Sequence, residues 1–251
     1  MARYRLTLEY DGGGFRGWQR QREGIVTVQS VLEEALARLC GHQVTVLGAG
    51  RTDTGVHATG QVAHFDTDHP REPWVFLRAL NVMTPETVTV LAVEAVEADF
   101  HARFSAVYRE YRYRVLAARS AAPALDRRRL WHHPRPLDVE RMREAAVDLL
   151  GTHNFSAFRA AFCQAKDPVR TLSRMEIERV QGEIHFWIGA NGFLQHMVRN
   201  IVGTLSLVGR GEWSPSVVGE ILLSQDRRQA GPTVPPWGLY LERVLYKGEA
   251  R

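Results

Sequence analysis

The fold of this chain is set first by the stretch Tyr4-Arg5-Leu6-Thr7-Leu8-Glu9-Tyr10, which runs directly into Asp11-Gly12-Gly13-Gly14. Large apolar residues stand at every second position of residues 4–10, with polar residues between them. This spacing predicts a half-buried strand, because successive side chains of a strand point to opposite faces. The glycine run that follows ends the strand in a turn.

Helical spacing begins soon after this turn. An apolar stripe with i, i+3, i+4, i+7 spacing predicts a helix over about 27–40, and Gly41 stands where a left-handed C-terminal residue belongs. The stripe consists of Val28, Val31, Leu32, Ala35, Leu36 and Leu39. Shorter patterns predict strands near 43–49 and 61–67, a helix near 73–82 and a strand near 87–96.

A similar order of elements then repeats, although the two sequences are not close. Tyr111, Tyr113 and Val115 alternate with arginines, as in a strand. Further patterns predict helices over 139–150, 194–209 and 215–224, strands over 171–180, 183–190 and 238–246, and a long loop over 118–137. We therefore expect an α+β fold with two similar halves, residues 1–107 and 108–251. Each half should hold a mainly antiparallel sheet with helices on one face, and the sheets should join around a central basic cleft.

The basic residues of the chain are almost all arginines. Lys and Arg total 32, and only Lys166 and Lys247 are lysines; the formal net charge is +4. The planar guanidinium suits phosphate oxygens and stacks on bases, so this composition favours a nucleic-acid partner. Genomic composition bias explains the same numbers equally well.

Several classes of protein are disfavoured. Cys40 and Cys163 form no C-x-x-C pair, which fits structural cysteines in a reducing compartment and no zinc site. No apolar run has the length of a signal-peptide core or a membrane span. We expect a cytoplasmic protein without membrane association and without a metal or other cofactor.

The segment richest in potential chemistry is Gly48-Ala49-Gly50-Arg51-Thr52-Asp53-Thr54-Gly55-Val56-His57. Glycines permit tight turns and close backbone approach to a ligand, so the segment could present Asp53 as a reactive carboxylate, with Arg51 beside it. The alternative is an Asx-turn, in which the aspartate only caps its own backbone. The segment lacks the G-K-[ST] of a phosphate-binding loop and does not match G-x-G-x-x-G.

Several ordered blocks resemble the TruA-type tRNA pseudouridine synthases. They are GRTDTGVHATGQVAHF (50–65), DGGGFRGWQRQ (11–21), FHARFSA with REYRYRV (100–115), NFSAFRAAFCQAKDPVRTL (154–172), FLQHMVRNIVG (193–203) and GLYLERV (238–244). The resemblance covers nearly the whole chain. One departure is Thr54, where many members carry a small Ala; it puts the packing beside Asp53 in doubt but not the aspartate.

The resemblance implies a reaction and roles for residues. Uridine would be isomerised to pseudouridine at positions 38, 39 and/or 40 of the tRNA anticodon stem-loop, without a cofactor. Asp53 would attack C1′ of the sugar or take a proton from C2′, and both routes stay open. Tyr111 would stack on the flipped uracil, although periodicity alone favours a core residue alternating with Tyr113. Arg199 would pair with Asp53; on the helix it would share a face with His196 and Gly203, where glycine permits a close approach.

Other basic residues are candidates for RNA contact. Arg51 could hold a phosphate or the flipped nucleotide, and His57 could contact RNA or serve only as a hydrogen-bonding residue of its loop. Dispersed arginines would supply phosphate contacts. The candidates are Arg16, Arg20, Arg22 and Arg103, with Arg109, Arg112, Arg114 and Arg127–Arg129 as further members. The resemblance also implies a homodimer.

Two other functions compete with this interpretation. A noncatalytic RNA-binding protein would not depend on Asp53, but it would be expected to carry an RNP-type aromatic pattern, which is absent from the sequence. A glycosidic-bond hydrolase would need a second carboxylate near Asp53, and Asp66 or Glu110 could supply one through folding.

Overall fold

The computed structural model describes residues 1–250 and divides into two compact units. Unit 1 comprises residues from Met1 to Val107 together with the segment from Tyr240 onward, and unit 2 runs from Tyr108 to Leu239. The sequence placed the C-terminal segment in the second half, whereas it groups with unit 1. The reason is strand pairing, since Tyr240 and Leu241 pair in parallel with His57 and Ala58.

The sheet of unit 1 is built around the strand predicted from residues 4–10. Its order is β4-β1-β3-β10, with β2 paired to β3, and every pairing except β3 with β10 is antiparallel. The strands are β1 (Ala2–Tyr10), β2 (Val46–Gly48), β3 (His57–Thr67), β4 (Val88–Val96) and β10 (Leu239–Tyr246). The alternation in β1 has the expected consequence, because Tyr4, Leu6, Leu8 and Tyr10 are all buried.

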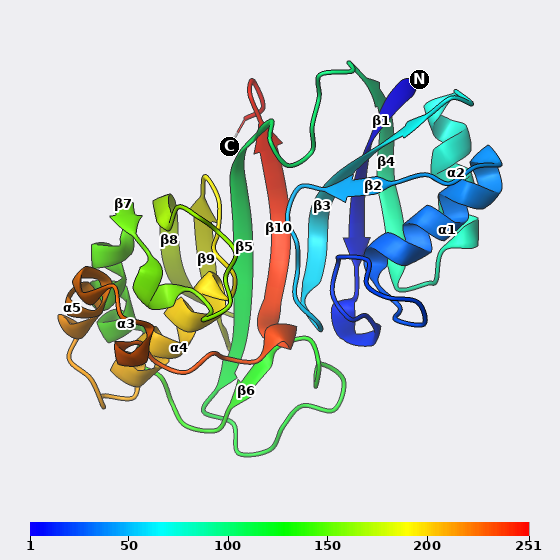
Figure 1. Cartoon of the computed structure of the whole chain (residues 1–251). Coiled ribbons are helices and arrows are strands. Elements are labelled where there is room, and N and C mark those ends of the chain that lie inside the picture. The colour runs from blue at the N-terminus through cyan, green and yellow to red at the C-terminus, as the bar shows by residue number, and fades with distance from the viewer. Residues whose placement is uncertain (251) are drawn as a thin grey trace. The chain divides into compact units, whose positions relative to one another are not determined.

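Two helices complete unit 1, α1 (Val28–Cys40) and α2 (Pro73–Met83) (Figure 1). Thr27 caps α1 by accepting a hydrogen bond from the Ser30 backbone N–H, and Gly41 ends it with a φ of 75°. The α2 helix packs on β1 and β3 through the rings of Tyr4, Phe65 and Phe76, whose centroids are 4.7–5.4 Å apart. The two predicted helices and the predicted strands of this half are therefore present.

The sheet of unit 2 has the order β5-β9-β8-β7, and all three pairings are antiparallel. The strands are β5 (Ala106–Ala117), β7 (Gly151–Asn154), β8 (Val169–Val180) and β9 (Glu183–Ala190). The helices are α3 (Val139–Ala146), α4 (Met197–Gly209) and α5 (Val217–Ser224), which gather beside this sheet (Figure 1). The expected α+β class with mainly antiparallel pairing is confirmed.

Several elements differ from the prediction. The α3 helix ends at Ala146 and continues as a 3-10 turn, Val147–Leu149, before Gly151 opens β7. The loop over 118–137 contains a short strand, β6 (Trp131–His133), paired in parallel with β5. The α4 helix starts at Met197 because His196 has a left-handed backbone, with a φ of 63°. In the described part of the chain, no helix is long and apolar enough to cross a membrane.

Candidate functional site

Asp53 occupies the first position of a tight turn in unit 1. The Val56 backbone N–H donates to the Asp53 carbonyl over 3.1 Å, and Gly55 has a φ of 81°. A positive φ at the third position of a β-turn favours glycine, which explains Gly55. The Asp53 side chain is half-buried and Arg51 is exposed. The turn therefore fixes the backbone that carries the carboxylate.

Residues on both sides of Asp53 are held by hydrogen bonds. The Gln61 side chain donates to the Gly50 carbonyl over 2.8 Å, and the Trp18 backbone N–H donates to the Thr52 carbonyl over 3.0 Å. The hydroxyls of Thr52 and Tyr10 share a hydrogen bond of 2.8 Å. Burial raises the pKa of Tyr10 to about 12, against the lowering effect of its bonds to Thr52 and Gln61. Tyr10 therefore stays neutral and serves as a fixed partner of the loop.

The glycine-rich segment 11–18 packs against the Asp53 loop. A Cβ atom on Gly12 would lie 1.9 Å from the Val56 carbonyl oxygen, and one on Gly17 would lie 2.7 Å from the Thr52 carbonyl oxygen. A Cβ atom on Gly48 would lie 2.5 Å from the Trp18 ring. From the sequence, the loop glycines are expected to leave space for a ligand. At Gly48 the neighbour is instead another segment of the protein, so this glycine serves packing.

His57 is a structural residue of the same loop. Its ring is buried, its Nδ1 accepts a hydrogen bond of 3.1 Å from the Gly12 backbone N–H, and it stacks on Tyr240 with centroids 4.7 Å apart. These contacts match the hydrogen-bonding role considered for His57. They also explain why β10 groups with unit 1, since Tyr240 is the first β10 residue of that unit.

Tyr111 lies on β5 in unit 2 and is buried, with 7% of its surface exposed. Its ring meets the edge of Phe193 at a centroid distance of 5.0 Å and an angle of 85°. Tyr113, two residues further on, is fully buried and donates its hydroxyl to the Pro235 carbonyl over 2.8 Å. Burial raises the pKa of Tyr113 well above its usual value, against an opposing effect of Arg199. Both tyrosines are thus buried, Tyr113 with a hydrogen-bonded hydroxyl and Tyr111 beside the ring of Phe193.

Arg199 lies on α4 against the segment 231–236. Its Nε donates to the Val234 carbonyl over 2.8 Å. A Cβ atom on Gly203 would lie 1.8 Å from the Pro232 carbonyl oxygen, so the expected close approach at this glycine is made by the protein backbone. His196 does not share the helical face of Arg199 and Gly203, because it precedes the helix in a left-handed conformation. That part of the prediction is wrong.

Four of the arginines proposed for RNA contact fall into two groups. Arg16, Arg22 and Arg103 are exposed. Arg20 forms an ion pair of 2.8 Å with Glu33, whose side chain is only 4% exposed and also accepts from the Val46 backbone N–H. The Arg20 guanidinium therefore has a structural task in unit 1, which the sequence pattern did not show.

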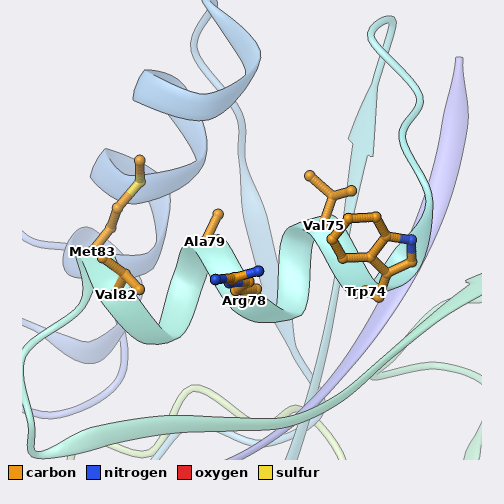
Figure 2. Close-up of a pocket in the computed structure, with 6 residues that line it drawn as sticks. All are labelled: Trp74, Val75, Arg78, Ala79, Val82 and Met83. Carbon is orange, nitrogen blue, oxygen red and sulfur yellow. The ribbon is translucent and has the colours of Figure 1, made fainter.

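Two surface features were not expected from the sequence. The outer side of α2 forms a shallow apolar hollow between Trp74 and Met83, with Arg78 midway along it (Figure 2). A second, polar hollow in unit 2 is lined by Ser156, Arg159 and Arg227 among others. In the sequence, only two arginine-containing segments, 154–160 and 226–229, pointed to the polar hollow, and these segments are far apart in the chain. Within residues 1–250, no group of three or more His, Cys, Asp or Glu side chains is placed to hold a metal ion.

Comparison with known proteins gives consistent results. The family model described as tRNA pseudouridine synthase matches residues 7–105 and 145–247. The chain is 52% identical to tRNA pseudouridine synthase A of Rhodospirillum rubrum, over 99% of this chain and 89% of that protein. It is also 52% identical to the protein of that name in Paramagnetospirillum magneticum, over 98% and 96%.

A third relative and one solved structure complete the comparison. The tRNA pseudouridine synthase A of Alcanivorax borkumensis is 49% identical, over 98% of this chain and 92% of that protein. One chain in a structure of a Cbf5-Nop10-Gar1 complex aligns with 95% of this chain over 48% of its own length. The identity is 12% and the TM-score is 0.38, which is a weak likeness. The family model and the three relatives agree over nearly the full length, and the chain therefore belongs to the TruA-type tRNA pseudouridine synthase family of isomerases.

Proposed function

We propose that this chain isomerises uridine to pseudouridine at positions 38, 39 and/or 40 of the tRNA anticodon stem-loop, with Asp53 as its catalytic carboxylate. The observation that carries the proposal is the position of Asp53 on a hydrogen-bonded turn in a chain that belongs to this family over nearly its whole length. The rigid turn favours catalysis because a carboxylate that is already oriented needs little reorganisation during the reaction.

The reaction balances without any co-reactant. The N1–C1′ bond of the target uridine breaks, the uracil turns, and a C5–C1′ bond forms. The hydrogen on C5 is lost to solvent and N1 gains a proton, so the product is an isomer of the substrate. Asp53 acts either by bonding to C1′, which is then released as C5 attacks, or by removing and returning a proton at C2′.

Tyr111 and Arg199 are proposed to bind the target uridine. The target base must leave its stack, which costs a few kcal/mol, and stacking on an aromatic ring returns about 1–3 kcal/mol. Of the two alternating tyrosines, Tyr113 is fully buried, whereas 7% of the Tyr111 surface is exposed, so Tyr111 suits this role better. Arg199 is proposed as a substrate-binding residue, because a guanidinium binds anionic oxygens through paired N–H donors.

Binding of the tRNA is proposed to depend on phosphate contacts by exposed arginines. Arg16, Arg22, Arg51 and Arg103 are exposed and therefore accessible to a phosphate. Arg20 is a weaker candidate because Glu33 already engages it. We also propose that the chain is cytoplasmic and that it acts as a homodimer. Light scattering of the purified protein tests the dimer.

The test is release of tritium from tRNA labelled at uridine C5. The wild-type protein should release tritium, and Asp53→Ala should lower the rate by about a thousandfold or more while tRNA binding persists. Glu23→Gln, at an exposed carboxylate on a loop, is the matched control and should behave as wild type. Near wild-type turnover by Asp53→Ala would show that another residue carries the chemistry.

The same reaction mixtures separate the two competing functions. A noncatalytic RNA-binding protein would bind tRNA and release no tritium. A glycosidic-bond hydrolase would liberate free uracil and leave an abasic position in the tRNA. Chromatography of the digested tRNA distinguishes both outcomes from pseudouridine.

A further inference from the structure

The polar hollow of unit 2 has the properties of an anion site. It measures about 510 Å³ and lies between the residues around the 3-10 turn Ser156–Phe158 and those of the 3-10 turn Arg227–Gln229. Its lining includes Arg159, Arg227 and Arg228 and only one carboxylate, that of Asp226. The hollow therefore carries an excess of positive charge.

Arg227 is the central residue of this hollow. Its guanidinium donates to the Asn200 Oδ1 over 3.1 Å, to the Thr233 Oγ1 over 3.2 Å and to the Ala230 carbonyl over 3.2 Å, which are all neutral acceptors. Burial lowers the pKa of Arg227, and no carboxylate among the described residues opposes this effect. A partly buried charge without a counter-ion is costly, and an anion arriving from solvent would relieve that cost.

The single carboxylate of the hollow is already engaged. Asp226 accepts hydrogen bonds of 2.7–3.0 Å from the Arg228 side chain and one of 3.0 Å from the Arg228 backbone N–H. This close pair leaves the charges of Arg227 and Arg159 uncompensated at the hollow. Arg159 is partly exposed at the other side of the hollow, and Ser156 adds a hydroxyl.

The Arg227 guanidinium is fixed by the helix that also carries Arg199. Asn200, which holds Arg227, is fully buried on α4 and donates to the Phe158 carbonyl over 2.7 Å. Its Oδ1 also accepts from the Thr233 hydroxyl over 2.6 Å. These bonds join both sides of the hollow to one residue of α4. The Arg227 side of the hollow is therefore pre-organised before any ligand binds.

We propose that this hollow, with Arg159 and Arg227 as its two donors, binds a backbone phosphate of the tRNA substrate. Guanidinium groups bind phosphate oxygens through paired N–H donors, and a hydroxyl such as that of Ser156 adds a further donor. The polar, open lining suits a phosphodiester that remains partly hydrated. The inference rests on the proposed function, because it takes the same tRNA as ligand.

The test measures tRNA binding as a function of salt. Each phosphate contact contributes about 0.7–0.9 to the slope of log K against log salt, so the double variant Arg159→Gln/Arg227→Gln should lower that slope by about 1.5. Its Kd for tRNA should rise about tenfold at low salt. Arg38→Gln removes one arginine charge, as each single substitution does, from an exposed position at the end of α1 and should leave Kd and slope unchanged.

Two further measurements make the result decisive. Arg159→Gln alone leaves the Asn200 hydrogen bonds intact and should lower the slope by about 0.8, so a folding defect in the double variant does not obscure the outcome. Wild-type slopes in both variants would overturn the proposal. So would stabilisation of the wild-type protein by inorganic phosphate together with unchanged tRNA binding by the variants, because the hollow would then bind free phosphate. Absence of tritium release by the wild type tests the proposed function separately.

Discussion

Gly17 shows how a single residue with no side chain controls the geometry around Asp53. Its φ is +87°, and a Cβ atom there would lie 2.7 Å from the Thr52 carbonyl oxygen and 3.3 Å from the Asp53 carbonyl carbon. Gly24 has a nearly equal φ of +82°, but a Cβ atom there would meet no atom within 4 Å. The two glycines therefore differ mainly in whether the Asp53 loop lies against them.

We predict that Gly17→Ala destabilises the protein more than Gly24→Ala. The left-handed backbone costs about 1–2 kcal/mol in both variants, and the backbone clash at Gly17 adds about 1–3 kcal/mol. Urea unfolding measures the difference, and tritium release should fall only in Gly17→Ala because the clash displaces the loop. Equal losses of stability would mean that the loop moves away at little cost.

His64 makes the stability of unit 1 depend on pH. The residue is buried, and its Nδ1 accepts a hydrogen bond of 3.2 Å from the Ala102 backbone N–H, which protonation of that nitrogen would break. Burial, with smaller effects of His101 and Arg3, lowers its pKa from 6.5 to about 4. Between pH 4 and pH 6.5 the unfolded chain therefore binds more protons than the folded chain. The free energy of unfolding consequently rises with pH across this range.

We predict that the free energy of unfolding falls by about 1–3 kcal/mol as the pH is lowered from 6.5 to 4. His64→Gln should remove most of this slope in urea titrations performed across the window. A smaller slope should remain from His101, whose pKa is also lowered by burial. Parallel pH profiles for the wild type and the variant would exclude His64 as the cause.

Among the elements, those with a strict local period could be predicted from sequence. The β1 strand and the α1 helix follow their apolar spacing, and Gly41 ends α1 as expected. The β6 strand could not be predicted because its three residues gain their hydrogen bonds from β5, a partner distant in the chain. The α3 helix ends before Gly151 because its last predicted turn adopts 3-10 geometry at Val147–Leu149.

The candidate site was predictable in its residues but not in its contacts. The glycine-rich string around Asp53 identified the loop. Nothing local to the string showed that Gly12, Gly17 and Trp18 would pack against it, because those residues are more than 30 positions away. His57 and Arg20 are further cases, in which the partners Tyr240 and Glu33 decide the role of each side chain.

Gly203 in α4 is a helical glycine whose replacement by alanine should destabilise the protein, contrary to the usual effect of this substitution. Replacing glycine by alanine inside a helix normally stabilises it by up to about 1 kcal/mol. At Gly203 the new Cβ would lie 1.8 Å from the Pro232 carbonyl oxygen, so Gly203→Ala should destabilise the protein by about 2–4 kcal/mol. Gly219→Ala in α5 is the control, because its nearest atom at 2.7 Å is the movable Asp148 carboxylate. Urea unfolding of the pair tests the assignment, which fails if Gly203→Ala is as stable as the control.

At the scale of the whole molecule, unit 1 is assembled from both ends of the chain. The β10 strand pairs with β3 at His57 and Ala58, next to the Asp53 loop. Thr59 donates to the Glu242 carboxylate over 2.8 Å, and the Tyr246 hydroxyl donates to the Ala102 carbonyl over 2.8 Å. No local pattern could predict this arrangement, since the contacts join residues more than 140 positions apart. The C-terminal strand therefore stabilises the unit that carries the proposed catalytic residue.

This arrangement predicts a local effect of a truncation at the chain terminus. A chain that ends at Leu239 retains all of unit 2 but lacks the part of β10 that pairs with β3. Backbone amides of β3 and of residues 101–102 should then exchange with deuterium about tenfold faster or more, because the hydrogen bonds and ring contacts that hold them are lost. Amides of the β8 and β9 pairing, which lies within unit 2, should keep their protection. Equal acceleration in both units would mean that the chain unfolds as one cooperative body, whereas acceleration confined to β3 and its neighbours would show that β10 stabilises the Asp53 loop from the far end of the sequence.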